Sequence, residues 1–124
     1  MRRALMVVLL VVLTAVAIDV LGDRTQNRPD WTPPGSRTVL TFDVDTRRAE
    51  QPVGEAARAL WQICGLTVPN QLVALEIRAG GTGTGTLTPA LGPHELERIT
   101  GCLQDATIDR VRGDVLSVVD EPAA

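Results

Sequence analysis

The side chains of this 124-residue chain that are best suited to chemistry are two cysteines and a single histidine. Cys64 and Cys102 could form a disulfide, react as redox thiols or bind a metal ion. No C-x-x-C pair occurs, and "HELER", which contains His94, lacks the second histidine of an H-E-x-x-H zinc motif. We therefore expect no metal and no cofactor. A structural disulfide is the favoured interpretation; free buried thiols and redox or metal chemistry are the alternatives.

Two aspartates, Asp43 and Asp45, share one face of a predicted strand and lie about 7 Å apart by the rise of a strand. Such a pair could bind calcium or act as a general acid and base, but a solvated sheet face is the more common setting for it. Ser36 and Ser117 have no base beside them in the sequence. Because no set of nucleophile, base and orienting group can be assembled, we expect a protein that is not an enzyme.

The segment "GGTGTGTLTPALGPHE", residues 80–95, contains the glycines that a phosphate-binding loop would need. A dinucleotide loop requires G-x-G-x-x-G between a strand and a helix, and here the third glycine is missing at that offset. A P-loop needs a lysine, and the chain has none. A strand explains the alternation better, with Thr82 and Thr84 on one face and glycines on the other, after a hairpin turn at Gly80-Gly81. We expect no nucleotide.

The composition argues against nucleic-acid binding. The formal net charge is −3, all 12 basic residues are arginines spread along the chain, and there are only one phenylalanine and two tryptophans. The chain thus has neither a basic patch nor a set of aromatic residues on which bases could stack.

The N-terminal sequence "MRRALMVVLLVVLTAVAIDV" predicts export. Arg2 and Arg3 precede an apolar run from Ala4 to Ile18, which is typical of a signal peptide or a signal anchor. An uncleaved anchor over residues 1–22 would make a single-pass membrane protein, whereas "AVA" also fits cleavage after Ala17 and secretion. In both cases the arginines hold the N-terminus inside and the rest of the chain is extracytoplasmic.

Residues 23–37 are polar, include Pro33-Pro34 and show no apolar period, so they predict a linker between the membrane and a domain. Trp31 lies inside this linker. It could pack on the edge of the domain, or it could serve as an interfacial anchor or a docking residue.

Residues 38–120 show alternating strand and helix patterns, followed by a tail at 121–124. Strands are predicted at 38–45, 71–80, the glycine segment and 114–120, and helices at 52–65 and 92–111. In the second strand Val73, Leu75 and Ile77 should face inward. Each helix carries one cysteine on its apolar stripe. The order of elements is that of a ferredoxin-like split βαββαβ domain of the α+β class, with an antiparallel sheet and two helices on one face.

The segment "LTPALGPHELERITGCLQDATIDRV", residues 87–111, resembles a group of small actinobacterial proteins that have an N-terminal membrane segment and a short exported domain. Trp61 and Cys64 extend the resemblance more loosely. It implies a cell-envelope location and a cysteine pair, and no catalytic residue.

Two weaker resemblances concern layout. The chain is similar to TonB-C-like envelope domains, some of which carry one cysteine per helix, but it has no TonB-type box and no long periplasmic spacer. Around "TLTPALGPH…GC" it is similar to subtilisin-inhibitor-like secreted proteins, but it lacks their further cysteines and a reactive loop after the second helix.

The function that these observations favour is a membrane-tethered, extracytoplasmic interaction domain that binds another envelope protein. The alternatives are a secreted ligand-binding or inhibitor-like module and a thiol-redox or metal-binding protein. The candidate contacts are the open sheet face or an exposed strand edge, with Trp31 as a further docking residue. The residues expected on the open face are Thr41, Asp43, Asp45, Thr82 and Thr84.

Overall fold

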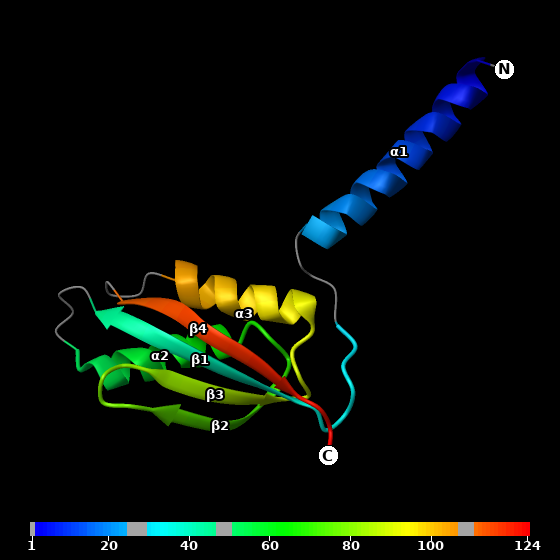
Figure 1. Cartoon of the computed structure of the whole chain (residues 1–124). Coiled ribbons are helices and arrows are strands. Elements are labelled where there is room, and N and C mark those ends of the chain that lie inside the picture. Colours follow the sequence, from blue (N-terminus) through cyan, green and yellow to red (C-terminus); the bar gives the residue numbers. More distant parts are fainter. Residues whose placement is uncertain (1, 25–29, 47–50, 107–110) are drawn as a thin grey trace.

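Four antiparallel strands form one open sheet, and two helices pack on one of its faces (Figure 1). The computed structural model describes residues 2–24, 30–46, 51–106 and 111–124. The strand order is β2-β3-β1-β4, and each neighbouring pair is antiparallel. The predicted α+β class with an antiparallel sheet is confirmed. The elements are α1 (Arg2–Arg24), β1 (Arg37–Thr46), α2 (Val53–Gly65), β2 (Gln71–Ile77), β3 (Gly83–Thr88), α3 (Pro93–Asp105) and β4 (Val111–Glu121).

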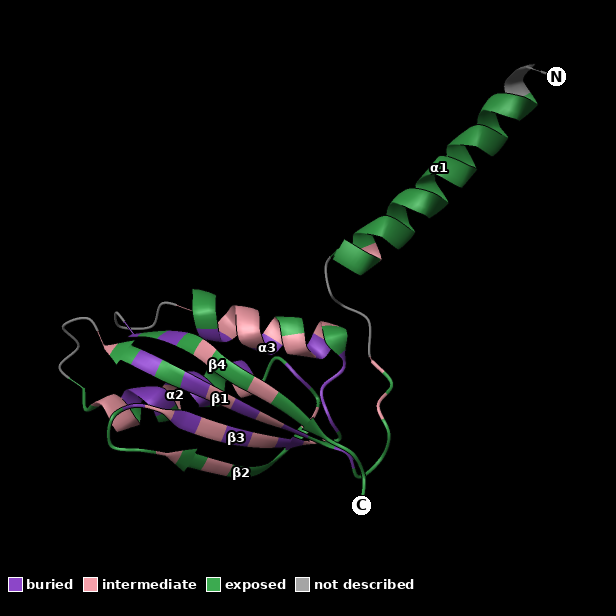
Figure 2. Ribbon diagram, viewed as in Figure 1, coloured by how far each residue is buried: buried purple, intermediate pink, exposed green. Residues whose placement is uncertain are grey.

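The hydrophobic core lies between the sheet and the helices α2 and α3, because strand and helix periods each place apolar residues on one face. The inward residues predicted for β1 are Leu40, Phe42 and Val44, and each is at most 5% exposed. Figure 2 shows the resulting alternation of buried and exposed residues along β1. On α2 the predicted apolar stripe is buried at Ala56, Ala57, Leu60, Trp61 and Cys64.

The glycine segment forms β3, as predicted, and its glycines face the core while its threonines face away. A Cβ atom on Gly83 would lie 2.3 Å from the Phe42 ring, and one on Gly85 would lie 2.3 Å from the Trp61 ring. The two rings stack on each other with centroids 5.3 Å apart. The alternating glycines therefore make room for the only two large aromatic side chains of the core.

The prediction that Val73 faces inward is wrong. Val73 does not face inward: it is 50% exposed, because a register shift between Leu72 and Ala74 interrupts the alternation of β2. Leu75 and Ile77 do pack against the core. The shift has the form of a β-bulge, which turns one extra side chain out of the regular pattern.

The helix predicted for residues 92–111 ends at Asp105, and Val111 is instead the first residue of β4. The sequence "DATIDRV" is rich in aspartate and β-branched residues, which have low helix propensity. Residues 107–110 lie outside the described residues. Val111 is 3% exposed, so the early start of β4 adds one more apolar side chain to the core.

The N-terminal helix α1 is separate from this core. The candidate span Ala4–Arg24 is 21 residues long, and an 18-residue window within it has a mean hydropathy of 2.9 with no residue buried. The helix is therefore long and apolar enough to cross a membrane, and a signal sequence has the same properties.

Candidate functional site

The open face of the sheet brings together four of the residues predicted to form an interaction surface. Thr41 of β1 lies opposite Thr84 of β3, with their Oγ1 atoms 3.4 Å apart. Thr82, directly before β3, donates a hydrogen bond to Asp43 of β1, also at 3.4 Å. Asp45 lies near the end of β1, in register with Arg112 of β4. The result is a polar surface on the side of the sheet away from the helices.

Trp31 is not part of that surface. Its side chain is 84% exposed, so it does not pack on the edge of the domain. An exposed tryptophan between an apolar N-terminal helix and a domain is available to a membrane interface or a partner.

The two cysteines are joined in the structure. The sulfur atoms of Cys64 and Cys102 are 2.03 Å apart and connect the end of α2 to the middle of α3. Cys64 is fully buried, and Cys102 is partly buried against the core. The burial of Cys64 suits a structural crosslink between the helices, because a cysteine that reacts with other molecules must be accessible to them.

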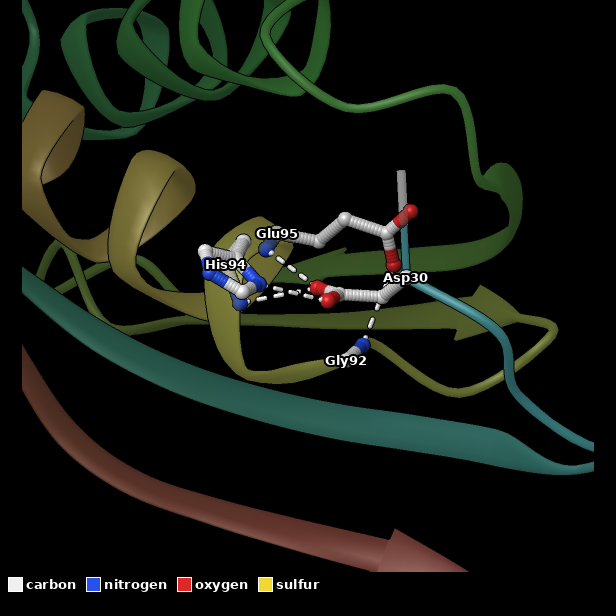
Figure 3. A network of polar contacts seen from close by, with 4 residues as sticks. All are labelled: Asp30, Gly92, His94 and Glu95. Atoms are coloured by element: carbon white, nitrogen blue, oxygen red, sulfur yellow. Dashed lines mark hydrogen bonds and ion pairs between the residues drawn. The ribbon is translucent and has the colours of Figure 1, made fainter. Parts of the chain in front are cut away.

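A polar cluster that the sequence did not predict lies at the N-terminus of α3 (Figure 3). The helix begins after Gly92, which has no side chain to cap it. Asp30 takes that role: its Oδ2 atom accepts hydrogen bonds from the backbone N–H groups of His94 at 2.7 Å and Glu95 at 2.9 Å. Glu95 accepts a hydrogen bond from the Gly92 N–H at 3.0 Å. The segment that leads from the N-terminal helix thus caps a helix of the domain.

Asp30 also pairs with the ring of His94, whose Nδ1 lies 2.7 Å from Asp30 Oδ1. Burial raises the pKa of Asp30, but hydrogen bonds from the His94 side chain and the two backbone N–H groups, together with the charge of His94, outweigh burial and lower that pKa. An aspartate that orients a histidine also occurs in catalytic sets. Among the described residues, however, no hydroxyl or thiol hydrogen-bonds to His94. The arrangement can anchor the linker and has no partner for nucleophilic catalysis in the described part of the chain.

One partial signal for this cluster is present in the sequence. Pro93 in the first turn and Glu95 at the third helical position are typical of a helix start. The partner Asp30 lies 64 residues before His94, and no local pattern identifies it. Gly92 is required by this contact, because a Cβ atom there would lie 2.0 Å from the Cβ of Asp30.

A partly apolar groove that could hold a ligand lies between α2 and the edge strand β2. Its deeper part has a volume of about 440 Å³, and a second part of about 400 Å³ continues past Arg58, which lines both. Trp61 and Leu87, at most 2% exposed, lie at the base of the deeper part. Leu66 and Leu72 line the same part and are 86% and 42% exposed. We refer to these two cavities, which share Arg58, as the α2/β2 groove.

Sequence reasoning missed this groove. The strand edge was named as a possible contact, but neither Leu66 nor Arg58 was singled out. Leu66 follows the last turn of α2, outside the helical period, and such a position predicts nothing about its surroundings. Only the packing of α2 against the sheet shows that β2 is left half covered.

Comparison of the chain with protein-family models, with curated proteins and with solved structures gave no match. A functional proposal therefore depends on the geometry of the surfaces described above.

Proposed function

We propose that the chain is a non-enzymatic interaction domain of the cell envelope, held on the outer side of the membrane by α1. The observation that carries the proposal is the α2/β2 groove, which lies beside a strand edge that no described strand covers. Apolar surface next to an open edge promotes association, and proteins usually protect it unless it serves binding.

The location is supported by α1 and by the charges that precede it. A 21-residue apolar helix can span the hydrocarbon core, and Arg2 and Arg3 before it favour an N-terminus on the cytoplasmic side. The chain from Arg24 to Asp30 can extend by at most about 20 Å. With Asp30 bound to α3, the domain would stay close to the membrane surface, and so would its partner.

We assign the domain to the ferredoxin-like split βαββαβ arrangement. The element order after α1 and the antiparallel strand order, with β3 and β1 in the centre, support this assignment. In this arrangement β2 and β4 are the sheet edges, and the face opposite the helices is open. The polar surface of Thr41, Asp43, Thr82 and Thr84 is therefore a second place where a partner could bind.

A secreted ligand-binding or inhibitor-like module is the second candidate. The deeper cavity of about 440 Å³, with Trp61 and Leu87 at its base, has a size that suits a small apolar ligand. This candidate requires cleavage after Ala17 and free protein in the culture medium. A thiol-redox function is less well supported, because Cys64 is fully buried.

Site-specific photo-crosslinking in native membranes tests the proposal. A photoreactive amino acid would replace Leu66 in the groove, Thr84 on the open face or, as the matched control, the exposed Glu97 of α3. We expect a discrete crosslinked protein from Leu66 or Thr84 and none from Glu97. Crosslinks from none of the three positions, with the protein intact in the membrane, would refute an interaction function. Recovery of the protein only from the medium would favour the secreted module.

A further inference from the structure

We propose that the α2/β2 groove binds an extended, acidic segment of another protein, which adds to the sheet as a fifth strand beside β2. This inference rests on the proposed interaction function and names its surface and the chemistry of the partner. The argument uses the hydrogen bonds of β2, the shape of the groove and its charge.

The outer edge of β2 has backbone groups that face away from β3. In an antiparallel pair, residues alternate between those that exchange hydrogen bonds and those that do not. Arg78 donates its backbone N–H to the carbonyl oxygen of Thr82 at 2.9 Å. By alternation, Leu75 and Ile77 direct their N–H and C=O groups to the outer edge, where no described strand pairs with them. These groups could bind the main chain of an added strand.

This edge has one of the usual features that prevent strand addition, the β-bulge near the start of β2, and lacks most of the others. Proteins often protect an edge with lysine, proline or inward-pointing charges. Strand β2, "QLVALEI", has a single charged residue, Glu76, which pairs in register with Thr84. The register shift between Leu72 and Ala74 disturbs only the first half of the strand, so the second half stays regular.

The groove gives an added strand a place for alternate side chains. Side chains along a strand point in turn to either face of the sheet. Those on the helix side of a strand beside β2 would lie over the deeper cavity, whose base is formed by Trp61 and Leu87 and whose rim includes Leu66. A leucine-sized apolar side chain fits this volume and chemistry, and it would cover apolar surface that is now exposed.

The charged residues that line the groove favour an acidic segment. Arg58 is the only charged residue that lines the deeper cavity, and in the neighbouring part it is joined by Arg78 and Glu55, which leaves the groove positive. The chain as a whole has a net charge of −3, so this sign is a local feature. A carboxylate in the bound segment would complement Arg58.

The spacing of the two contacts predicts a short motif. Arg58 and Trp61 are three residues apart on α2, a separation that places helix neighbours about 5–6 Å apart. Residues on one face of a strand repeat at about 7 Å, which is every second residue. The segment should therefore carry an apolar residue and an acidic residue separated by one residue.

Labelled ten-residue peptides are the probe, measured by fluorescence anisotropy with the full chain in detergent micelles. One leucine is fixed, and Glu, Gln or Arg is placed two positions before or after it. We expect Glu to bind about two to five times more tightly than Gln in one orientation, with Arg weaker than Gln. In the variant Arg58→Glu this order of peptide affinities should reverse, so that the Arg peptide binds most tightly. The matched control is Arg112→Glu on the opposite edge strand, which should keep the original order.

Peptides with N-methyl groups at alternate positions test the strand pairing itself. Methylation of the N–H groups that face β2 should abolish binding, and methylation of the other set should not. Equal effects of the two sets, an unchanged order in Arg58→Glu, or no binding of any probe would overturn the inference. The photo-crosslinking experiment distinguishes this inference from the proposed function. Crosslinks from Thr84 but not from Leu66 would support an interaction function and refute binding in the groove. Crosslinks from neither position would refute both proposals.

Discussion

The substitution Gly85→Ala tests whether the glycine strand exists to accommodate aromatic rings. The new Cβ atom would lie 2.3 Å from two carbon atoms of the Trp61 ring, far inside van der Waals contact. Trp61 has little freedom to move away, because it is 2% exposed and stacks on Phe42 with ring planes 12° apart. We therefore expect the ring pair or β3 to shift.

The magnitude follows from two opposing effects. Overpacking of a core costs about 1–3 kcal/mol, while replacing glycine lowers the entropy of the unfolded chain and returns about 0.4–1 kcal/mol. Because Trp61 is only 2% exposed and is held by its stacking on Phe42, we expect overpacking to outweigh the entropy gain, with a net loss of about 2 kcal/mol. For a domain of this size that loss lowers Tm by about 10 °C.

Thermal unfolding of the full chain in micelles, followed by near-ultraviolet circular dichroism with the cysteines oxidised, gives the answer. The matched control is Gly101→Ala on α3, where the new Cβ would have no heavy atom within 4 Å apart from its chain neighbours and the backbone of its own helix. It should raise stability by about 0.5–1 kcal/mol, since alanine favours a helix. If Gly85→Ala proved as stable as the unchanged protein, the role assigned to the glycines would be wrong.

Three further predictions concern other parts of the chain. Alkylation and intact mass of the protein purified without reductant should show two thiols only after reduction, and labelling before reduction would contradict the bridge. The double variant Cys64→Ala/Cys102→Ala should have an unfolding free energy lower by about 4 kcal/mol, for the sequence separation of 38. Asp30→Ala should cost about 1 kcal/mol through loss of the α3 cap. Because folding lowers the pKa of Asp30, the stabilisation by its carboxylate is complete above the ordinary pKa of 3.8 and is lost as the pH falls through the lower folded-state pKa. Denaturant titrations at several pH values measure this loss, and equal acid sensitivity of Asp30→Ala and the unchanged chain would refute it. With α1 inserted in nanodiscs, brominated lipids should quench Trp31 fluorescence and leave that of the buried Trp61 unchanged; no quenching would place Trp31 away from the membrane interface.

The features that could be predicted from the sequence are those that a local period determines. The stripe of α2 and the alternation of β1 were predicted correctly, since burial on one face selects apolar residues at 3.6 or 2 residue intervals. The glycine strand could be distinguished from a phosphate loop because its alternation has a period of two. What the glycines contact, the rings of Phe42 and Trp61, required the structure.

The features that were missed depend on contacts between distant segments. Asp30 caps α3 across a separation of more than 60 residues, and no property of "RPDW" distinguishes it from other linker aspartates. Val73 turns outward because of a register shift, which depends on the pairing of β2 with β3. The groove likewise results from where α2 lies across the sheet.

The position of Trp61 connects the glycine strand to the α2/β2 groove. Its ring fills the space above Gly85 and also forms part of the base of the deeper cavity, whereas Phe42 above Gly83 does not line that cavity. Gly85→Ala should therefore weaken binding of the leucine and glutamate probe at a temperature where the variant remains folded, and Gly83→Ala should weaken it much less. Both variants meet a ring at 2.3 Å, so both should lose stability. If they lowered probe affinity equally, binding would follow overall stability, and the position of Trp61 would have no specific part in forming the groove.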